Sequence, residues 1–266
     1  MKAAPDASFP RPRAPVPWLT TGQMVEVDRL MVDQYGIDLP RMMENAGRSL
    51  ARLAQAKFLA GRRRDGAVAV LAGPGGNGGG ALVAARWLAN HGSRVRILLA
   101  RPASELAPVT AAQLAILERM GVPARRVGGT GEAEAAAPVP PEPPDLILDG
   151  VLGYGGRGNP TGGAEGLITW AGAQAAPVLA LDTPSGVDTT TGAVGSPAIR
   201  AAATMTLALP KEGLRVPGAR DHVGRLYLAD IGVPPGLYGR LGLAVGPLFA
   251  QADILTLDIP GGRAAR

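Results

Sequence analysis

Short apolar runs that alternate with helical patterns constrain the fold of this chain more than any other feature. Runs with the length and composition of buried strands occur at 67–72, 95–100, 145–149, 178–182, 204–209 and 225–229, with a weaker one at 125–127. Apolar residues at helical spacing separate several of these runs, at 81–90, 106–120 and 164–174. Strands that alternate with helices form parallel βαβ units, so we predict an α/β fold with a doubly wound, mostly parallel sheet.

Two helices are expected before the first strand. Thr20 or Thr21 can cap a helix that ends at Gly36, and Pro40 suits the first turn of the next helix. Apolar residues recur at helical spacing along that second helix, and we expect its segment 43–47 to pack in the core rather than at a subunit interface.

The chain is predicted to form one domain. Its length and its hydrophobic content of 46% are sufficient for one sizeable core. We assign residues 18–245 to this domain, 1–17 to a proline-rich N-terminal extension that is expected to be disordered, and 246–266 to a C-terminal tail. The segment 128–144 is rich in Ala, Pro and Glu and is expected to be a mobile surface excursion.

The composition argues against several kinds of chemistry. The chain has no Cys and two His, so we expect neither a thiol nucleophile, nor a disulfide, nor a zinc site of the usual ligand type. The net charge is +5, but only Arg62, Arg63 and Arg64 form a tight basic cluster, and no aromatic residues interleave with it. We therefore expect no nucleic-acid binding. No run approaches about 18 consecutive apolar residues, so no membrane span is expected and the default location is cytoplasmic.

A glycine-rich stretch at 73–80 follows the first expected strand and opens a helix. Backbone N–H groups in such a stretch can approach an anion closely, and the helix dipole favours negative charge, which suits a diphosphate. The stretch is not a P-loop, because no Lys-Ser or Lys-Thr pair follows it. A flexible turn without a ligand is the alternative. Asn77 adds an amide that can offer an oxygen to a cation or a hydrogen bond to a ligand.

Two carboxylates stand at the ends of predicted strands. Asp149 precedes a glycine-rich turn that carries Arg157, a natural contact surface for phosphate or ribose, although this Asp could simply cap its turn. Asp182 ends a fully apolar run, where it could cap the following proline turn or, if partly buried, transfer protons near neutral pH. Ligands bind outside the carboxyl ends of the strands in such sheets, so Gly73 and both carboxylates should converge on one crevice. Lys211 could add a positive charge there, but a surface position is expected for it.

These motifs, in this order, resemble those of the NAD(P)H-hydrate epimerase family, also called the YjeF N-terminal domain, over about residues 18–235. The similar segments are Thr20-x-x-x-Met24 with Asp28, Met43-Glu44-Asn45-Ala46-Gly47, the glycine–asparagine loop, Asp149 with its glycine-rich turn, Asp182-x-Pro-Ser-Gly, and Pro210-Lys211-Glu212-Gly213. The resemblance implies a Rossmann-like three-layer α/β/α sandwich with a mostly parallel central sheet, often paired into a homodimer.

The resemblance implies an isomerase that interconverts the R and S forms of hydrated NADH and NADPH, in which water has added to the nicotinamide ring. Inversion of the carbinolamine carbon requires loss and return of hydroxyl, and Asp182 is the candidate acid–base residue. The resemblance also implies K⁺ bound by Asn77, Asp149 and Ser185, which are hard oxygen donors, and a separate dehydratase that acts on the product. The implied substrate contacts are Gly76, Asn77, Gly78, Gly79, Gly80, Gly153, Tyr154, Gly155, Gly156, Arg157, Gly158, Asn159 and Asp182.

The glycine-rich stretch departs from the common family pattern Asn-Asn-Gly-Gly-Asp-Gly, because Gly76 and Gly80 replace an Asn and the Asp. The departure favours an alternative from another class, a non-catalytic nucleotide-binding or scaffold module that keeps the fold. A sugar- or nucleotide-modifying enzyme that uses the same crevice is a third possibility. The chain is also too short for the kinase-like dehydratase domain that often follows in bifunctional relatives.

Overall fold

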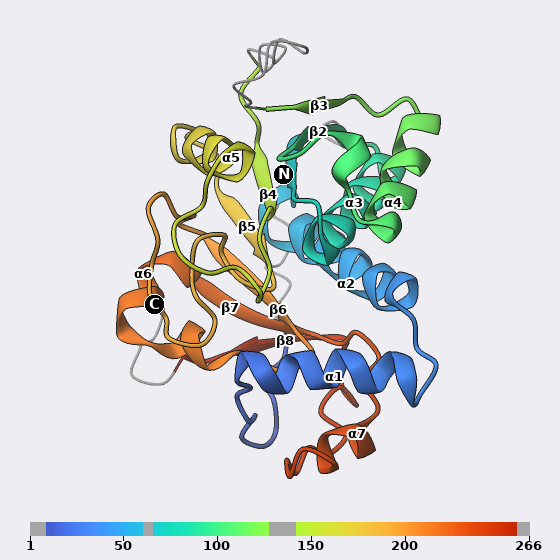
Figure 1. Ribbon diagram of the computed structural model, residues 1–266, viewed down its shortest axis with the longest axis vertical. Helices are drawn as coiled ribbons and strands as arrows, with labels where there is room; N and C mark the ends of the chain where they lie inside the picture. The colour runs from blue at the N-terminus through green and yellow to red at the C-terminus, as the bar shows by residue number, and fades with distance from the viewer. Residues whose placement is uncertain (1–8, 61–65, 128–141, 260–266) are drawn as a thin grey trace, which may run out of the picture.

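A single eight-stranded sheet forms the centre of the protein, which we describe from a computed structural model (Figure 1). The structure describes residues 9–60, 66–127 and 142–259. The strand order is β3-β2-β1-β4-β5-β6-β7-β8, and every neighbouring pair is parallel except β7 and β8. The strands are β1 (Ala67–Ala72), β2 (Arg94–Leu99), β3 (Ala124–Arg126), β4 (Leu146–Gly150), β5 (Val178–Leu181), β6 (Ala203–Leu207), β7 (Arg225–Ala229) and β8 (Ile254–Leu257).

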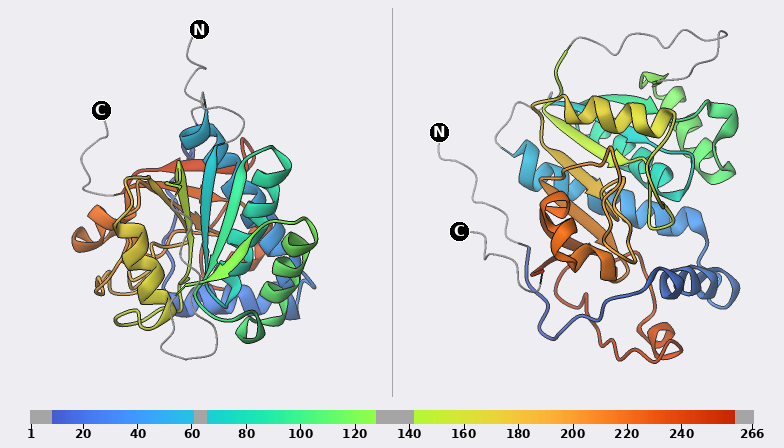
Figure 2. Two further views of the ribbon diagram at one scale, coloured as in Figure 1. Left: turned by 90° about the horizontal axis from the view of Figure 1, so that it is seen from above. Right: turned by 60° about the vertical axis from the view of Figure 1, so that its left-hand side comes forward.

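Helices cover both faces of the sheet, which confirms the predicted three-layer sandwich (Figure 2). The α-helices are α1 (Thr21–Asp33), α2 (Leu39–Ala54), α3 (Gly76–Asn90), α4 (Pro108–Arg119), α5 (Gly163–Gly172), α6 (Arg220–Val223) and α7 (Pro235–Gly239). A short π-helix (Gln55–Leu59) follows α2, and single 3₁₀ turns occur at Ala103–Glu105, Glu212–Arg215 and Pro217–Ala219.

Side chains of β1 alternate between the two layers. Val68, Val70 and Ala72 belong to the core formed with α2, α3 and α4, whereas Ala69 and Leu71 belong to the core under α5. Successive side chains of a strand point to opposite faces, so a strand covered on both faces is apolar throughout. This explains why the inner strands are continuous apolar runs in the sequence.

The N-terminal helices begin as the sequence predicted. Thr20 caps α1 and forms a capping box with Gln23, which satisfies backbone N–H groups at the start of the helix. Asp38 caps α2, and its side chain accepts a hydrogen bond from the backbone N–H of Arg41. The segment 43–47 packs within the described chain, where Met43 and Ala46 are buried, in agreement with the expected core position.

Both ends of the described chain lie along the sheet. Within the N-terminal segment that we expected to be disordered, Phe9 packs edge-on against Tyr227, and Pro10 O accepts a hydrogen bond from Thr256 N. Within the segment assigned to a C-terminal tail, β8 pairs antiparallel with β7. Part of each segment therefore contacts the sheet, while 1–8 and 260–266 lie outside the described residues.

Most of the predicted surface excursion at 128–144 lies outside the described residues. Among the residues that the structure does describe, no helix is long and apolar enough to cross a membrane.

The sheet changes winding direction between β1 and β4, and there the segments at the ends of these two strands come very close. Gly73 N donates a hydrogen bond to Gly150 O at 3.0 Å, and a Cβ atom at position 73 would lie 1.8 Å from Val151 O. Only glycine fits such an approach. Because the connections from β1 and β4 leave in opposite directions, this point is where a ligand crevice is expected in a doubly wound sheet.

The close contact between α2 and α3 yields a test of the packing. A Cβ atom at Gly47 would lie 2.4 Å from Val83 Cβ and 2.6 Å from Gly80 O, so Gly47→Ala should lower the free energy of unfolding by about 1–3 kcal/mol. Gly166→Ala is the matched control, since that helical position has no heavy atom within 4 Å, and should raise the free energy of unfolding by about 0.5–1 kcal/mol. Urea unfolding measures both changes, and equal effects of the two variants would contradict this packing.

Candidate active site

A cavity of about 590 Å³ opens at the carboxyl ends of β1, β4 and β5. One wall is apolar and comes mainly from α1 and α2, with Met24, Leu39, Met42, Met43 and Ala46. The other walls carry the polar groups, which come from the start of α3, the loop after β4, the end of β5 and the segment after β6. Of the three groups predicted to converge on one crevice, Asp182 lines this cavity, whereas Gly73 and Asp149 do not.

The first turn of α3 borders this cavity. The helix begins at Gly76, so most of the glycine-rich stretch is helical rather than a loop, and Gly75 is the N-cap residue. The first N–H groups of a helix have no partner inside it, and its dipole is positive at this end. Because Gly75, Gly76 and Asn77 line the cavity, an anionic group of a ligand can be bound there.

The next three glycines of α3 serve close packing. A Cβ atom at Gly78 would lie 1.9 Å from Gly73 O, and one at Gly79 would lie 2.7 Å from Met43 Sδ. Neither residue lines the cavity, although both were expected to contact the substrate. Gly80 does line it, but a Cβ atom there would lie 2.8 Å from Leu181 Cδ2. Leu181 therefore occupies space that a larger residue at position 80 would need.

Asn77 joins the loops that follow β4 and β5. Its amide Nδ2 donates to Leu152 O at 2.8 Å and to Leu181 O at 2.9 Å. Since both contacts use the nitrogen, the Oδ1 atom is the part of the amide that could bind a cation.

Asp149 and Ser185 form a buried pair beside this amide. Ser185 donates to the Asp149 carboxylate through Oγ at 2.6 Å and through its backbone N at 2.8 Å, and Val151 N adds a bond of 3.2 Å. Burial raises the pKa of Asp149 to about 6, while these hydrogen bonds oppose the shift. Leu152 N donates to Ser185 Oγ, so Leu152 links the pair to Asn77. The three predicted cation ligands therefore belong to one hydrogen-bonded group.

Asp182 pairs with Lys211 at the end of β5. The lysine Nζ donates to Asp182 Oδ1 and also to Leu207 O at 2.9 Å. Lys211 is completely buried, so the expected surface position for it was wrong. A lone ammonium is costly to bury, and the adjacent carboxylate and carbonyl oxygen compensate for that cost.

The backbone holds the Asp182 carboxylate toward the cavity. The residue has a φ of 63°, a left-handed conformation that is uncommon for residues other than glycine and clusters at functional sites. Among the described residues, every hydrogen bond to its carboxylate is accepted by Oδ1, including a bond of 3.3 Å from Leu207 N. The Oδ2 atom is therefore available to a ligand.

A second carboxylate, Asp28 on α1, lines the same cavity. Its Oδ2 accepts a hydrogen bond of 2.5 Å from the hydroxyl of Tyr154, which was among the predicted contacts. Burial raises the pKa of Asp28, and the bond from Tyr154 opposes the shift. Asp28 is part of a sequence motif, but it was not predicted as a site residue. The feature of the sequence that could have identified Asp28 is a charged side chain next to Val27, which lies on the buried side of α1.

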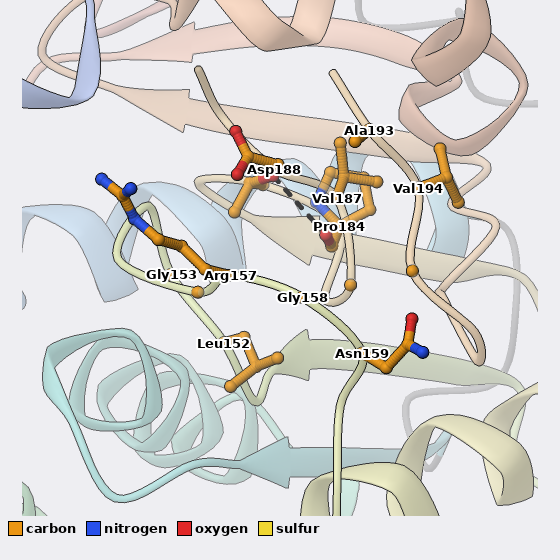
Figure 3. A pocket seen from close by; sticks show the side chains of 14 residues that line it. Leu152, Gly153, Arg157, Gly158, Asn159, Pro184, Val187, Asp188, Ala193 and Val194 are labelled. Carbon is orange, nitrogen blue, oxygen red and sulfur yellow. Dashed lines mark hydrogen bonds between the residues drawn. The ribbon is translucent and has the colours of Figure 1, made fainter. Parts of the chain in front are cut away.

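The remaining predicted contacts line a smaller cavity of about 180 Å³ (Figure 3). Arg157, Gly158 and Asn159 extend from the loop after β4 and face a segment after β5 that includes Asp188 (Figure 3). A hydrogen bond from Thr191 N lowers the pKa of Asp188, and the charge of Arg157 contributes to the shift. The predicted substrate contacts are thus divided between two cavities.

The division follows the order of the loop after β4. The larger cavity takes Gly76, Asn77, Gly80, Gly153, Tyr154, Gly155, Gly156 and Asp182. The smaller cavity takes Gly153, Gly156, Arg157, Gly158 and Asn159. Gly153 and Gly156 line both, so the two cavities are neighbours along this loop.

Known proteins resemble this chain in sequence and in fold. It is 42% identical over 226 residues to the NAD(P)H-hydrate epimerase of Dehalogenimonas lykanthroporepellens, which covers 85% of this chain and 86% of that protein. It is 38% identical over 230 residues to the bifunctional NAD(P)H-hydrate repair enzyme Nnr of Salinibacter ruber, which covers 84% of this chain and 42% of that longer protein. The crystal structure of the yeast protein ynu0 has the same fold, with a TM-score of 0.75, 24% identity, and coverage of 91% of this chain and 100% of that one.

The family model for the YjeF-related protein N-terminus matches residues 40–213. This range is more than half of the chain and includes Asn77, Asp149, Asp182 and Lys211. The sequence-based recognition is therefore confirmed: the chain belongs to the YjeF-related protein N-terminus family.

Proposed function

We propose that this protein is an isomerase that epimerises the hydrates of NADH and NADPH, with Asp182 as the acid–base residue. The observation that carries the proposal is the buried Asp182–Lys211 pair on the wall of a cavity that also contains the free N-terminus of α3. Support also comes from the relative named NAD(P)H-hydrate epimerase, which aligns with 85% of the chain.

The chemistry needs at least one group that can give and take a proton at the hydrated carbon. The hydroxyl of a carbinolamine leaves as water when an acid protonates it, and the ring nitrogen's electron pair then forms a C=N bond. Water that returns to the other face of the ring gives the opposite epimer and releases a proton to a base. Asp182 can give or take this proton through Oδ2, while Lys211 balances the charge on Oδ1.

The cavity suits the rest of such a substrate. The apolar wall from α1 and α2 can pack against the nicotinamide ring. The N–H groups of Gly76 and Asn77 can donate to a phosphate oxygen. We expect the hydrated ring near Asp182 and the diphosphate near the start of α3.

The group formed by Asn77, Asp149 and Ser185 fits a K⁺ ion. Asp149 is completely buried, and no ion pair to it is found within the described residues. A bound cation would supply this missing countercharge, with Asn77 Oδ1 and Ser185 Oγ as further hard oxygen donors. In this position K⁺ would stabilise the loops that follow β4 and β5, on which the predicted contacts lie.

A non-catalytic binding module is the second candidate, and position 80 is the observation that favours it. The family pattern has an acid there, whereas this chain has Gly80 and a leucine side chain in the adjacent space. Position 76 has room for a side chain, because a Cβ atom there would meet only Met43 Cε, at 3.8 Å. Activity of the wild-type protein decides between the two candidates.

Asp182→Asn should lower the epimerisation rate at least about 100-fold, because the amide can neither donate nor accept the transferred proton in the same way. The assay supplies mixed R and S hydrates with an S-specific dehydratase and follows consumption of the R fraction. Asp33→Asn, at an exposed position on α1, is the control and should leave the rate unchanged. A wild-type protein that is folded, binds the hydrates and does not exceed the spontaneous rate would refute the enzymatic function.

Potassium should raise the thermal stability of the wild-type protein relative to choline at the same ionic strength. At a concentration 100 times the dissociation constant, binding would add about 2.7 kcal/mol to the free energy of unfolding. Asp149→Asn removes the buried charge and should abolish this difference, whereas Asp33→Asn should retain it. An equal effect of K⁺ on the wild type and Asp149→Asn would contradict the assignment of the ion to this group.

A further inference from the structure

Two carboxylates face the proposed reaction cavity, but one ammonium group is placed to neutralise only one of them. Lys211 donates to Asp182, whereas Asp28 forms no ion pair within the described residues. Within the residues that the structure describes, the only hydrogen bond found to Asp28 comes from a neutral phenol, that of Tyr154. Among the described residues, the lining of the cavity thus contains one positive charge, that of Lys211, and two carboxylates.

The surroundings of Asp28 act on its charge. Burial raises the pKa of Asp28 and the Asp182 charge adds to this shift, whereas the hydrogen bond from Tyr154 and the Lys211 charge oppose it. Two neighbouring acids in unequal surroundings tend to divide the roles of acid and base. Burial favours the protonated form of Asp28, and Lys211 supplies a countercharge beside the Asp182 carboxylate.

On the basis of the proposed function, we propose that Asp28 is a second catalytic acid–base residue and that Asp182 and Asp28 act on opposite faces of the hydrated ring. The two residues come from separate elements, α1 and the end of β5, and both line the 590 Å³ cavity. Epimerisation places the hydroxyl on one face before the reaction and on the other after it. Two acid–base groups meet this requirement without rotation of the substrate.

The protons balance in each direction. Protonated Asp28 gives its proton to the hydroxyl, the C–O bond breaks, water leaves, and the nitrogen electron pair forms the C=N bond. Water then adds to the carbon from the other face, the C=N electrons return to nitrogen, and ionised Asp182 takes the released proton. The enzyme is left with Asp182 protonated and Asp28 ionised, which is the state that converts the opposite epimer.

Tyr154 is a positioning residue in this scheme. Its hydroxyl holds Asp28 Oδ2, while its backbone carbonyl accepts a hydrogen bond of 2.9 Å from Thr189 Oγ1. Thr189 Oγ1 also lies 3.0 Å from Thr21 Oγ1 at the start of α1. The loop after β4 is therefore attached to α1, and this attachment directs the Asp28 carboxylate toward the cavity.

Exchange of the substrate hydroxyl with ¹⁸O-labelled water separates one-group from two-group chemistry. In the wild type, every inversion replaces the hydroxyl oxygen, so inversion and exchange should proceed together. In Asp28→Asn, Asp182 can still remove and return hydroxyl on its own face. We expect inversion to fall at least about 100-fold, while exchange persists in one epimer only.

The outcomes of this experiment are distinct. A wild-type protein without catalysed inversion or exchange would refute the proposed function itself. An active wild type together with an Asp28→Asn variant that inverts at the wild-type rate would refute only the role of Asp28. Loss of both inversion and exchange in folded Asp28→Asn would also refute it, because a purely structural role affects both processes equally.

Tyr154→Phe provides a second test if Asp28→Asn does not fold. The substitution removes one hydroxyl and retains the ring, so the fold should persist, as thermal melting will check. We expect the ratio of inversion to exchange to fall about tenfold, because a loosened Asp28 affects only one face. An unchanged ratio would overturn the positioning role. The control variant Asp33→Asn, at an exposed position on α1, should leave the ratio unchanged.

Discussion

The close approach of α3 to the switch point of the sheet is the constraint on which the site depends. Side chains are absent where the helix meets β1, since a Cβ atom at Gly78 would lie 1.9 Å from Gly73 O. The helix can therefore begin directly beside the ends of β1 and β4. Its N-terminal N–H groups border the cavity, and Asn77 reaches the loops after β4 and β5. A bulkier first turn would move all of these groups away from the sheet.

The acidic side chains near the start of α3 differ in how their charge is compensated. Asp149 is buried with hydrogen bonds but without an ion pair in the described chain, Asp182 is buried beside Lys211, and Asp28 is hydrogen-bonded to a phenol. Burial favours the neutral form of a carboxylate, whereas a nearby ammonium favours the charged form. Three acids thus have three different environments within one region. This arrangement allows one to serve structure and the others to handle protons.

The loop after β4 connects two cavities, whereas the sequence predicted one crevice for all of the contacts. Its first part contributes Gly153 and Tyr154 to the larger cavity, and its later part contributes Arg157 and Asn159 to the smaller one. An extended ligand with a ring and a charged end could use both. The smaller cavity combines a guanidinium with a carboxylate, Asp188, so it offers donors and acceptors at the far end of the loop.

The sequence by itself determined the fold class and most of the elements. The predicted strands at 67–72 and 225–229 agree with β1 and β7 to the residue, and Thr20 is one of the two predicted candidates for the helix cap. These features depend on local patterns: strands covered on both faces are apolar throughout, and a cap requires a particular side chain one residue before the helix. Asp149 and Asp182 could be named as candidate acids for a similar reason, since they stand at the ends of such strands.

Only the tertiary structure decided the burial of Lys211, the pairing of β8 and the neighbourhood of Asp28. Lys211 is buried because Asp182, 29 residues away, compensates its charge, and no local pattern records that partner. β8 is defined by its hydrogen bonds to β7, and Asp28 reaches Tyr154 across 126 residues. Local periodicity reports which face of an element is apolar, whereas the cost of a buried charge depends on which distant group lies opposite it.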